Sequence, residues 1–279
     1  MKTWFITGAS RGFGALIAKL ALANGDNVVA TARNPQAVTE RVGSHANLLP
    51  VALDVTDETQ ARAAAKAAIE RFGKIDVLLN NAGYGMLGAV EEASGDEVEK
   101  LYRTNVFGLL AVTRAVLPYM RGQRSGRILN ISSIGGYRAG AGFGVYCSTK
   151  FAVEGLSEAL HAELAPLGIH VTVVEPGYFR TDFLDSTSLT VSPASISDYN
   201  STVGAVRDIA LSLNHAQPGD PQRLAQVLVN FADAPNPPVR LPLGSDTVAA
   251  IEAKQIADTI ILSEWRSVSA STDFVVSEP

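Results

Sequence analysis

Short, nearly continuous apolar runs alternate with alanine-rich stretches of helical period through the first two thirds of the chain. The apolar runs lack the strict alternation of apolar and polar residues that marks a strand with one wet face. Continuous apolar runs are typical of parallel strands that are covered by helices on both sides. We therefore predict strands at Thr3–Thr7, Asn27–Thr31, Leu48–Leu53, Val77–Asn80, Gly126–Ile131 and His170–Glu175.

The stretches between these runs have the apolar spacing of helices. The predicted helices are Gly14–Asn24, Glu58–Phe72, Asp96–Met120 and Tyr146–Leu164. Strands that alternate with helices in this way form right-handed βαβ units. The pattern therefore predicts an α/β fold with a doubly wound, mostly parallel sheet and helices on both faces.

The last third of the chain has a different pattern. From residue 178 to residue 219 it is rich in Ser, Thr and Asp, with weak periodicity. After Asp220, a plausible N-cap, we predict a helix that begins with a proline, which suits the first helical position. The predicted elements are a helix at Pro221–Ala232, a short strand at Val239–Leu243 and a helix at Asp246–Leu262, followed by a polar tail. We interpret about 178–219 as a substrate lid and about 244–279 as a C-terminal extension of a single domain, 1–279.

Composition limits the classes of partner. The 279 residues, 47% of them hydrophobic, suffice for one sizeable core. The net charge of −5 gives no sign of nucleic acid or an anionic membrane surface as a partner, and no apolar run reaches the roughly 18 residues that span a bilayer. Cys147 is the only cysteine, which fits a reducing, cytoplasmic location. The four histidines lack metal-ligand spacing, so no metal site is expected.

A glycine-rich loop follows the first predicted strand, too early in the chain for a signal peptide, and leads directly into a helix. Its sequence is Thr7-Gly8-Ala9-Ser10-Arg11-Gly12-Phe13-Gly14. Glycines allow the backbone to approach a pyrophosphate closely, and the helix N-terminus offers unpaired N–H groups to the anion. A glycine-rich turn without a ligand is the alternative. The strand–loop–helix context favours a dinucleotide site, and its candidate contacts are Gly8, Ser10, Arg11, Gly12, Phe13 and Gly14.

The end of the second strand indicates which dinucleotide is bound. An acidic residue there accepts hydrogen bonds from a ribose 2′-OH and favours NAD, whereas a nearby arginine accommodates a 2′-phosphate. Here Ala32 occupies the acidic position and Arg33 follows it, while Arg11 lies in the glycine loop. Two guanidinium groups around one phosphate make a strong, charge-assisted site. We therefore expect NADP(H) as the cofactor; two solvated surface arginines are the alternative.

Tyr146 and Lys150 are four residues apart in a predicted helix, so their side chains point from one face. An unperturbed tyrosine titrates near ~10, too high for an efficient base at neutral pH. We expect the ammonium group of Lys150 to lower the pKa of Tyr146. Ser133 is placed to donate a hydrogen bond to a substrate oxygen and to stabilise developing alkoxide charge. Each residue alone has an ordinary packing or surface explanation.

The order of these motifs resembles that of the short-chain dehydrogenase/reductase family. The glycine spacing Thr-Gly-x-x-x-Gly-x-Gly is followed by Asn80-Asn81-Ala82-Gly83, Asn105, Ser133, Tyr146-Cys147-Ser148-Thr149-Lys150, Pro176-Gly177 and Thr181. The resemblance covers about residues 1–185 and implies a Rossmann-type fold. Phe13 departs from the pattern, since the family more often has an aliphatic residue there, and we expect only a slightly altered turn.

The resemblance also implies roles for individual residues. Tyr146 is then the general acid in reduction and the base in oxidation, Lys150 also binds the nicotinamide ribose, and Ser133, not its neighbour Ser132, orients the carbonyl. Asn105 holds a water that links Lys150 to solvent. Asp54 meets the adenine amino group beside the Val55 backbone; as an alternative it caps the helix that starts near Asp57. Further implied cofactor contacts are Asn81, Ala82, Gly83, Tyr146, Lys150, Pro176, Gly177, Phe179 and Thr181.

A glycine-rich stretch at 135–144 and apolar residues of the expected lid suggest a mostly apolar substrate pocket. The lid residues are Phe179, Phe183, Leu184 and Leu189. These features predict an NADPH-dependent carbonyl reductase or alcohol dehydrogenase that acts on a hydrophobic carbonyl or secondary alcohol. The helices at Asp96–Met120 and Tyr146–Leu164 commonly form a dimer face in the family, so a homo-oligomer is expected, although core packing explains their apolar residues equally.

Three other functions remain as alternatives. A catalytically idle, NADP-binding regulatory protein would have the same fold, since fold does not fix function; the complete set Asn105, Ser133, Tyr146 and Lys150 argues against it. An epimerase or dehydratase is disfavoured by the glycine spacing and the short C-terminal region. An enoyl reductase usually spaces its tyrosine and lysine further apart.

Overall fold

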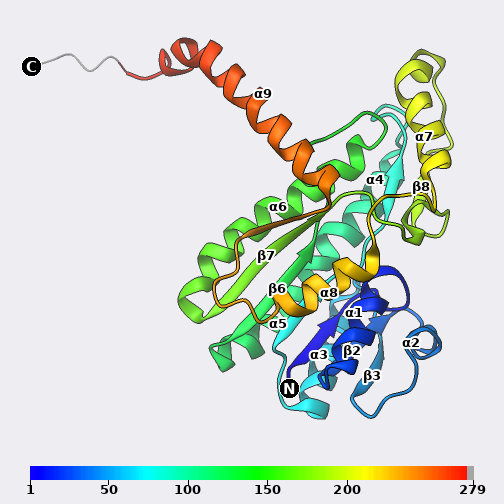
Figure 1. Ribbon diagram of the computed structural model, residues 1–279, viewed down its shortest axis with the longest axis vertical. Coiled ribbons are helices and arrows are strands. Elements are labelled where there is room, and N and C mark those ends of the chain that lie inside the picture. Colours follow the sequence, from blue (N-terminus) through cyan, green and yellow to red (C-terminus); the bar gives the residue numbers. More distant parts are fainter. Residues whose placement is uncertain (275–279) are drawn as a thin grey trace, which may run out of the picture.

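Seven parallel strands form one sheet at the centre of the protein, in the order β3-β2-β1-β4-β6-β7-β9 (Figure 1). The computed structural model describes residues 1–274. The strands are β1 Thr3–Ile6, β2 Asn27–Ala32, β3 Leu48–Ala52, β4 Val77–Asn80, β6 Gly126–Ile131, β7 Ile169–Pro176 and β9 Arg240–Leu243. The doubly wound parallel sheet predicted from the apolar runs is confirmed.

The direction in which the chain adds strands reverses at β1, which lies between β2 and β4. Phe5 of β1 is paired with Val29 of β2 on one side and with Leu78 of β4 on the other. The connections after β1 and after β4 therefore leave the sheet toward opposite sides. In sheets of this kind, ligands bind in the crevice that this reversal opens at the carboxyl ends of the strands.

Helices cover both faces of the sheet. The α-helices of the described residues are α1 Gly12–Ala23, α2 Pro35–Val42, α3 Glu58–Phe72, α4 Gly95–Tyr102, α5 Leu109–Gln123, α6 Gly144–Leu164, α7 Ala205–Leu213, α8 Pro221–Phe231 and α9 Ser245–Ala270. α1 and α8 pack against one face, and α3, α5 and α6 against the other. The two apolar layers bury the strands from both sides, which is why the strand sequences are almost continuously apolar.

The sequence predicted one regular helix at Asp96–Met120, but the structure interrupts its middle with a π-helical turn. α4 ends at Tyr102, and a π-helical turn at Arg103–Gly108 joins it to α5. Gly108 packs so tightly that a Cβ there would lie 2.7 Å from a methyl carbon of Val55. π turns inside helices are frequent at functional sites, and this one carries Asn105.

Segment 178–219 contains more regular structure than its weak periodicity suggests. β8 Leu189–Val191 pairs in parallel with β5 Gly85–Leu87 in a second, two-stranded sheet, and α7 lies beyond it. Strands of three residues are too short to show a period in sequence. α8 begins as predicted, because the carboxylate of Asp220 accepts hydrogen bonds from the backbone N–H groups of Gln222 and Arg223.

α9 extends beyond its predicted end at Leu262, as far as Ala270, and it points away from the rest of the molecule (Figure 1). The expected polar tail therefore begins later than the sequence indicated. The last five residues of the expected C-terminal extension, 275–279, lie outside the described residues. Within residues 1–274, no helix combines the length and the apolar content needed to cross a membrane.

Candidate active site

The glycine loop between β1 and α1 has the backbone shape that only glycine adopts easily. Gly8 and Gly12 have positive φ angles of 65° and 52°, a region that L side chains avoid. A Cβ on Gly14 would lie 2.6 Å from the backbone oxygen of Gly8. The loop is thus compact enough to bring its backbone against a ligand, and Gly14 is needed for packing between α1 and the loop.

The first turn of α1 offers its N–H groups to an anion. Arg11 occupies the N-cap position, and no side chain accepts a hydrogen bond from the first turn. A helix N-terminus that lacks a side-chain cap has free donors and a positive dipole end, which together suit a phosphate. The loop and the helix therefore fit the pyrophosphate of a dinucleotide.

The turn after β4 is fixed to this loop by hydrogen bonds. The side-chain amide of Asn81 donates to the backbone oxygens of Thr7 and Gly8 at 2.9 and 3.1 Å. The hydroxyl of Thr7 accepts from the backbone N–H groups of Asn81 and Ala82 at 2.9 and 3.0 Å. The ends of β1 and β4 are thereby held together as one rigid wall of the crevice.

The arginines expected at a 2′-phosphate are placed differently from each other. Arg33 is exposed at the end of β2 and lines the cavity beside the loop. Arg11 also lines the cavity, but its guanidinium donates to the backbone oxygen of Thr187 in segment 178–219 at 2.6 Å. Arg11 therefore links the nucleotide loop to that segment in this structure.

Asp54 does not cap α3. Its carboxylate accepts from the backbone N–H and the hydroxyl of Thr56 at 2.9 and 2.7 Å. Asp57 is the N-cap, accepting from the backbone N–H groups of Thr59 and Gln60. Of the two explanations that the sequence left open for Asp54, the capping one is therefore wrong.

A single cavity of about 1070 Å³ extends from the glycine loop to Tyr146. Nearly all of the predicted site residues line it. These are Gly8, Ser10, Arg11, Gly12, Phe13, Arg33, Asp54, Val55, Asn81, Ala82, Gly83, Ser133, Tyr146, Lys150, Pro176, Gly177, Phe179 and Thr181. Gly14 and Asn105 do not line the cavity and instead support residues that do.

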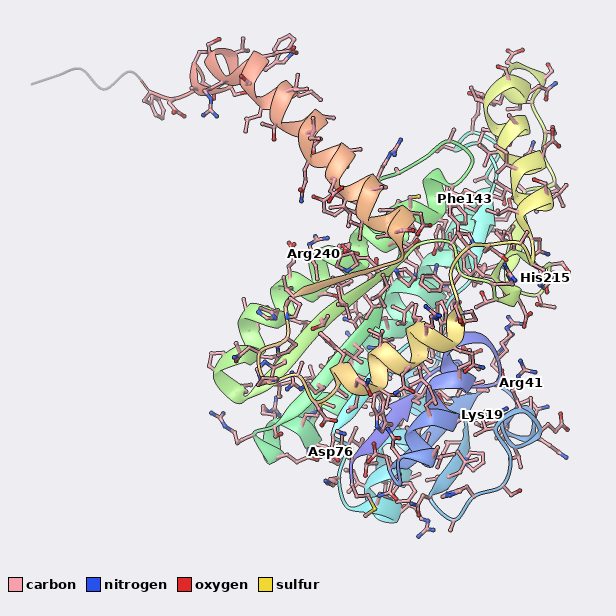
Figure 2. The ribbon with its side chains drawn as sticks, in the orientation of Figure 1. Lys19, Arg41, Asp76, Phe143, His215 and Arg240 are labelled. Carbon is pink, nitrogen blue, oxygen red and sulfur yellow. The ribbon has the colours of Figure 1, made fainter. Side chains whose placement is uncertain are left out.

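Tyr146 lines the cavity from the first turn of α6. Its ring packs against Phe183 at 5.6 Å and Phe143 at 6.2 Å between ring centroids; Phe143 is labelled in Figure 2. Burial raises the pKa of Tyr146, while a hydrogen bond with the Ser133 side chain opposes that rise. The expectation that Lys150 brings this pKa below its usual value is wrong for this structure, because burial dominates.

Lys150 lies one turn further along α6, with its ammonium nitrogen 5.7 Å from the centroid of the Tyr146 ring. The ammonium donates to the backbone oxygen of Ile131 at 2.8 Å. Burial lowers the pKa of Lys150 to about 8, and the nearby carboxylate of Glu154 opposes this change. The group therefore remains largely charged at neutral pH.

Asn105 uses its side chain to fix the turn after β4. Its amide nitrogen donates to the backbone oxygen of Tyr84 at 2.9 Å, and its oxygen accepts from the Tyr84 N–H at 3.1 Å. A Cβ on Gly83 would lie 3.1 Å from that oxygen and 3.9 Å from the Lys150 nitrogen. Asn105 thus lies directly behind Lys150.

The two adjacent serines face different surroundings. The hydroxyl of Ser133 accepts from the backbone N–H of Gly135 at 3.0 Å and lies beside the Tyr146 phenol. Ser132 is buried against Glu154, and a Cβ on Gly136 would lie 2.5 Å from its hydroxyl. The geometry therefore brings Ser133, and not Ser132, together with Tyr146.

An apolar part of the cavity wall includes residues that the sequence did not single out. Phe183, Leu184 and Leu189 line it as expected, and Val206 and Ile209 of α7 join them. The spacing of three between the latter two is helical and was the available signal. Asp246 and Ala250 of α9 also line the cavity, which nothing in their sequence context indicated.

Asp246 ties α9 to the cavity wall. Its carboxylate accepts from the backbone N–H of Tyr178 at 2.8 Å. Gly177 and Gly244 leave the space that it fills, since a Cβ at either would meet its oxygens. Within residues 1–274, no group of His, Cys, Asp or Glu side chains could hold a metal ion.

Comparison with known proteins agrees with this geometry. The family model described as short chain dehydrogenase matches residues 2–191. An oxidoreductase named BOA17 from Botryotinia fuckeliana is 41% identical over 275 residues, covering 97% of this chain and 99% of its own. A 3-ketodihydrosphingosine reductase from Bacteroides thetaiotaomicron is 39% identical over 240 residues, covering 86% of each chain.

Solved structures are similar as well. A short-chain dehydrogenase from Streptomyces avermitilis is 41% identical with a TM-score of 0.91, covering 98% of this chain and 99% of its own. A 3-ketoacyl-(acyl-carrier-protein) reductase from Brucella melitensis, solved with NADH, is 27% identical with a TM-score of 0.72, covering 87% and 96%. This chain belongs to the short-chain dehydrogenase family and is an oxidoreductase that uses a nicotinamide cofactor.

Proposed function

We propose that this protein transfers a hydride between NADPH and the carbonyl group of a mostly apolar substrate, with Tyr146 as the general acid in reduction and the base in the reverse reaction. The observation that carries the proposal is that Tyr146, Ser133 and Lys150 lie together on the wall of the cavity that the glycine loop also lines. A hydride donor bound along that loop and a carbonyl against the apolar part of the wall would meet beside the Tyr146 hydroxyl.

Each of the three side chains has a distinct part in the proposed reduction. The nicotinamide, when bound, supplies the hydride to the carbonyl carbon. Tyr146 gives its proton to the carbonyl oxygen, and its raised pKa keeps the phenol protonated until then. Ser133 donates a hydrogen bond to the same oxygen while negative charge develops there. Lys150 stabilises the phenolate that remains, and Asn105 supports the path by which a proton returns.

We propose NADP(H) rather than NAD(H) because the end of β2 carries no carboxylate. Ala32 occupies the position that would otherwise accept hydrogen bonds from a ribose 2′-OH, and the exposed Arg33 follows it. Arg11 reaches the same region of the cavity when it exchanges the Thr187 carbonyl for a phosphate oxygen. Such an exchange gains a charge-assisted bond in place of a neutral one.

For the substrate we propose a carbonyl attached to an apolar chain or ring. Several of the side chains that line the cavity with Tyr146 are aliphatic or aromatic, including Phe183, Leu189 and Val206. We further propose that segment 178–219 is the substrate lid, since it supplies most of this wall, and that the free, buried Cys147 reflects a cytoplasmic setting. The two relatives named as reductases of 3-keto compounds support a carbonyl substrate.

The decisive experiment follows NADPH absorbance with a panel of ketones and aldehydes, with NADH in parallel. The variant Tyr146→Phe should lose turnover by about a hundredfold or more, the size of a general acid–base contribution. It should bind NADPH as the wild type does. If Tyr146→Phe retains turnover, the proton-transfer assignment is wrong; if the wild type binds NADPH but reduces nothing in the panel, a cofactor-binding regulatory role replaces the proposal.

A further inference from the structure

α9 is attached to the body only by its first turns. Thr247 is buried and Ala250 half-buried, whereas every residue from Gln255 to Ala270 is exposed. Figure 1 shows the helix leaving the sheet and its covering helices and extending away from them. The exposed part carries six large apolar side chains, namely Ile256, Ile260, Ile261, Leu262, Trp265 and Val268. Helices with so much apolar surface are normally covered, and most helical stability in proteins comes from tertiary packing of one face.

One stripe along α9 has the spacing of a helix–helix seam. Its positions follow one another by four and three residues in alternation, which keeps them on one side of a helix that packs along another. The stripe consists of Ala250, Lys254, Ala257, Ile261, Glu264 and Val268. Of the six exposed apolar side chains, Ile261 and Val268 belong to this stripe. Two of its six members are oppositely charged, so an ordinary apolar core would not accept this surface.

The stripe is complementary to itself when a second copy runs in the opposite direction. An antiparallel pair that places Ala257 opposite Ile261 of the partner subunit also places Lys254 opposite Glu264 of the partner subunit. The same register places Ala250 opposite Val268 of the partner subunit. Each pair of facing residues, here called a layer, then combines a small residue with a large one, or a cation with an anion. Small residues opposite large ones let two helices approach closely, and opposite charges fix the register.

We propose that α9 pairs in an antiparallel manner with α9 of a second copy of this chain, along the stripe from Ala250 to Val268. The register leaves room for the two bodies. From residue 250 to residue 268 a helix rises about 27 Å, so the bodies lie at opposite ends of the pair. The occupant is thus a second copy and not an unrelated helix, because the stripe supplies both halves of each layer.

Two other charged residues of α9 lie away from the stripe and would not take part in the pairing. Glu252 and Arg266 lie on the opposite side of the helix, about 150° or more from the stripe centre at roughly 100° per residue. Lys254 bonds to both oxygens of Asp258 at 2.9 Å within its own helix. Within residues 1–274, Glu264 has no ion-pair partner. Pairing therefore supplies Glu264 with an opposite charge and leaves Glu252 in solvent as a natural control position.

The pair connects to the active site through the first turn of α9. Ala250 lines the cavity, and the carboxylate of Asp246 accepts a hydrogen bond from the backbone N–H of Tyr178. In the proposed register, Val268 of the partner subunit packs beside Ala250 at the mouth of the cavity. The helix that joins the two copies therefore also borders the space in which the substrate binds.

The test measures the dimer dissociation constant of the full chain by sedimentation velocity from about 1 to about 100 µM, since a two-helix interface is small and should dissociate on dilution. Lys254→Glu and Glu264→Lys each place like charges opposite one another in two layers. Each should raise the dissociation constant about tenfold or more. The double variant Lys254→Glu/Glu264→Lys restores opposite charges and should recover most of the wild-type affinity.

Glu252→Lys is the matched control, with the same charge change as Glu264→Lys on the opposite side, and it should leave the dissociation constant unchanged. Circular dichroism checks that helix content is preserved, since Lys254→Glu also removes the bond to Asp258. A wild type that is monomeric at about 100 µM overturns the proposal. So does a dimer that ignores both single changes, as one formed by α5 and α6 or by parallel pairing of α9 would, or a double variant without recovery.

Discussion

Arg240 joins three elements of the site through three carboxylates, and its replacement by methionine tests how far they depend on it. Its guanidinium contacts Glu154 at 2.8 Å and Glu158 at 2.8 Å on α6, and Glu175 at 2.6 Å on β7 (Figure 2 labels Arg240). Glu154 lies one turn beyond Lys150, and Glu175 immediately precedes Pro176 and Gly177 in the cavity wall. The side chain thus holds the catalytic helix against the strand that ends at the cofactor site.

The size of the effect follows from burial. The side chains of Glu154 and Glu175 are 4% and 1% exposed, whereas Glu158 is 54% exposed. Removal of one partner from a buried ion pair costs about 3–5 kcal/mol, because an uncompensated charge remains. An exposed pair contributes about 1 kcal/mol or less. We therefore expect Arg240→Met to reduce the free energy of unfolding by about 3–5 kcal/mol at pH 8, and Glu158→Gln by less than about 1 kcal/mol.

The loss of unfolding free energy in Arg240→Met should become smaller as the pH falls. Burial raises the pKa of Glu154 to about 7, and Arg240 is one of the groups that lower it. Without Arg240 the folded state binds protons more tightly than the unfolded state, so the stability of the variant rises with falling pH relative to wild type. At pH 8, the buried carboxylate of Glu154 in Arg240→Met must stay charged without its partner or take up a proton, and either costs free energy. Near pH 5 the carboxyl group is protonated, and this cost largely disappears.

Urea denaturation of both proteins between pH 5 and pH 8 measures this difference, with NADPH turnover followed in parallel. The double variant Arg240→Met/Glu154→Gln removes a charge along with its partner and should recover part of the lost stability at pH 8. If Arg240→Met costs less than about 1 kcal/mol at pH 8, or if its cost grows toward acid, the reasoning from buried carboxylates fails.

Three further tests concern other parts of the site. The rate of carbonyl reduction should fall as the pH rises through about 8, where Lys150 loses its proton. In Lys150→Arg this fall should occur at a higher pH. A wild-type rate that stays constant up to pH 10 would contradict the role of Lys150. Arg33→Ala should raise the dissociation constant for NADPH by about ten- to a hundredfold and leave that for NADH unchanged, as loss of one charge-assisted bond implies. Gly14→Ala should destabilise by about 1–3 kcal/mol, since its Cβ would meet the Gly8 oxygen at 2.6 Å. Gly155→Ala on α6, where a Cβ meets nothing within 4 Å, should instead stabilise by about 0.5–1 kcal/mol; equal effects in thermal unfolding would refute the steric argument.

The fold was predictable where one physical requirement governs a whole segment. Parallel strands covered on both faces must be apolar throughout, and β4 and β6 match their predicted bounds. The break at Arg103–Gly108 was not predictable, because it depends on the close approach of Gly108 to Val55 across the fold. The end of α9 was missed for the opposite reason, since every residue of Ser263–Ala270 is exposed and burial imposes no apolar pattern there.

The site was predictable where local chain geometry dictates residue type. Gly8 and Gly12 are required by positive φ angles, and such needs are visible in sequence. Contacts between distant segments left no such trace. The bond from Arg11 to Thr187 and the bond from Asp246 to the Tyr178 N–H both arise from folding of the last third of the chain onto the first.

The pKa of Tyr146 shows why sequence spacing alone misjudged the pair that it forms with Lys150. Spacing of four residues indicates proximity, and from that proximity we expected a lowered pKa of Tyr146. Burial acts on both groups and favours both neutral forms, raising the pKa of Tyr146 and lowering that of Lys150 to about 8. The attraction between ammonium and phenolate exists only after the proton has left, and it is strong in the same low-dielectric surroundings. Lys150 therefore acts on the state that follows proton transfer, where its charge lowers the free energy of the reaction, rather than on the resting phenol.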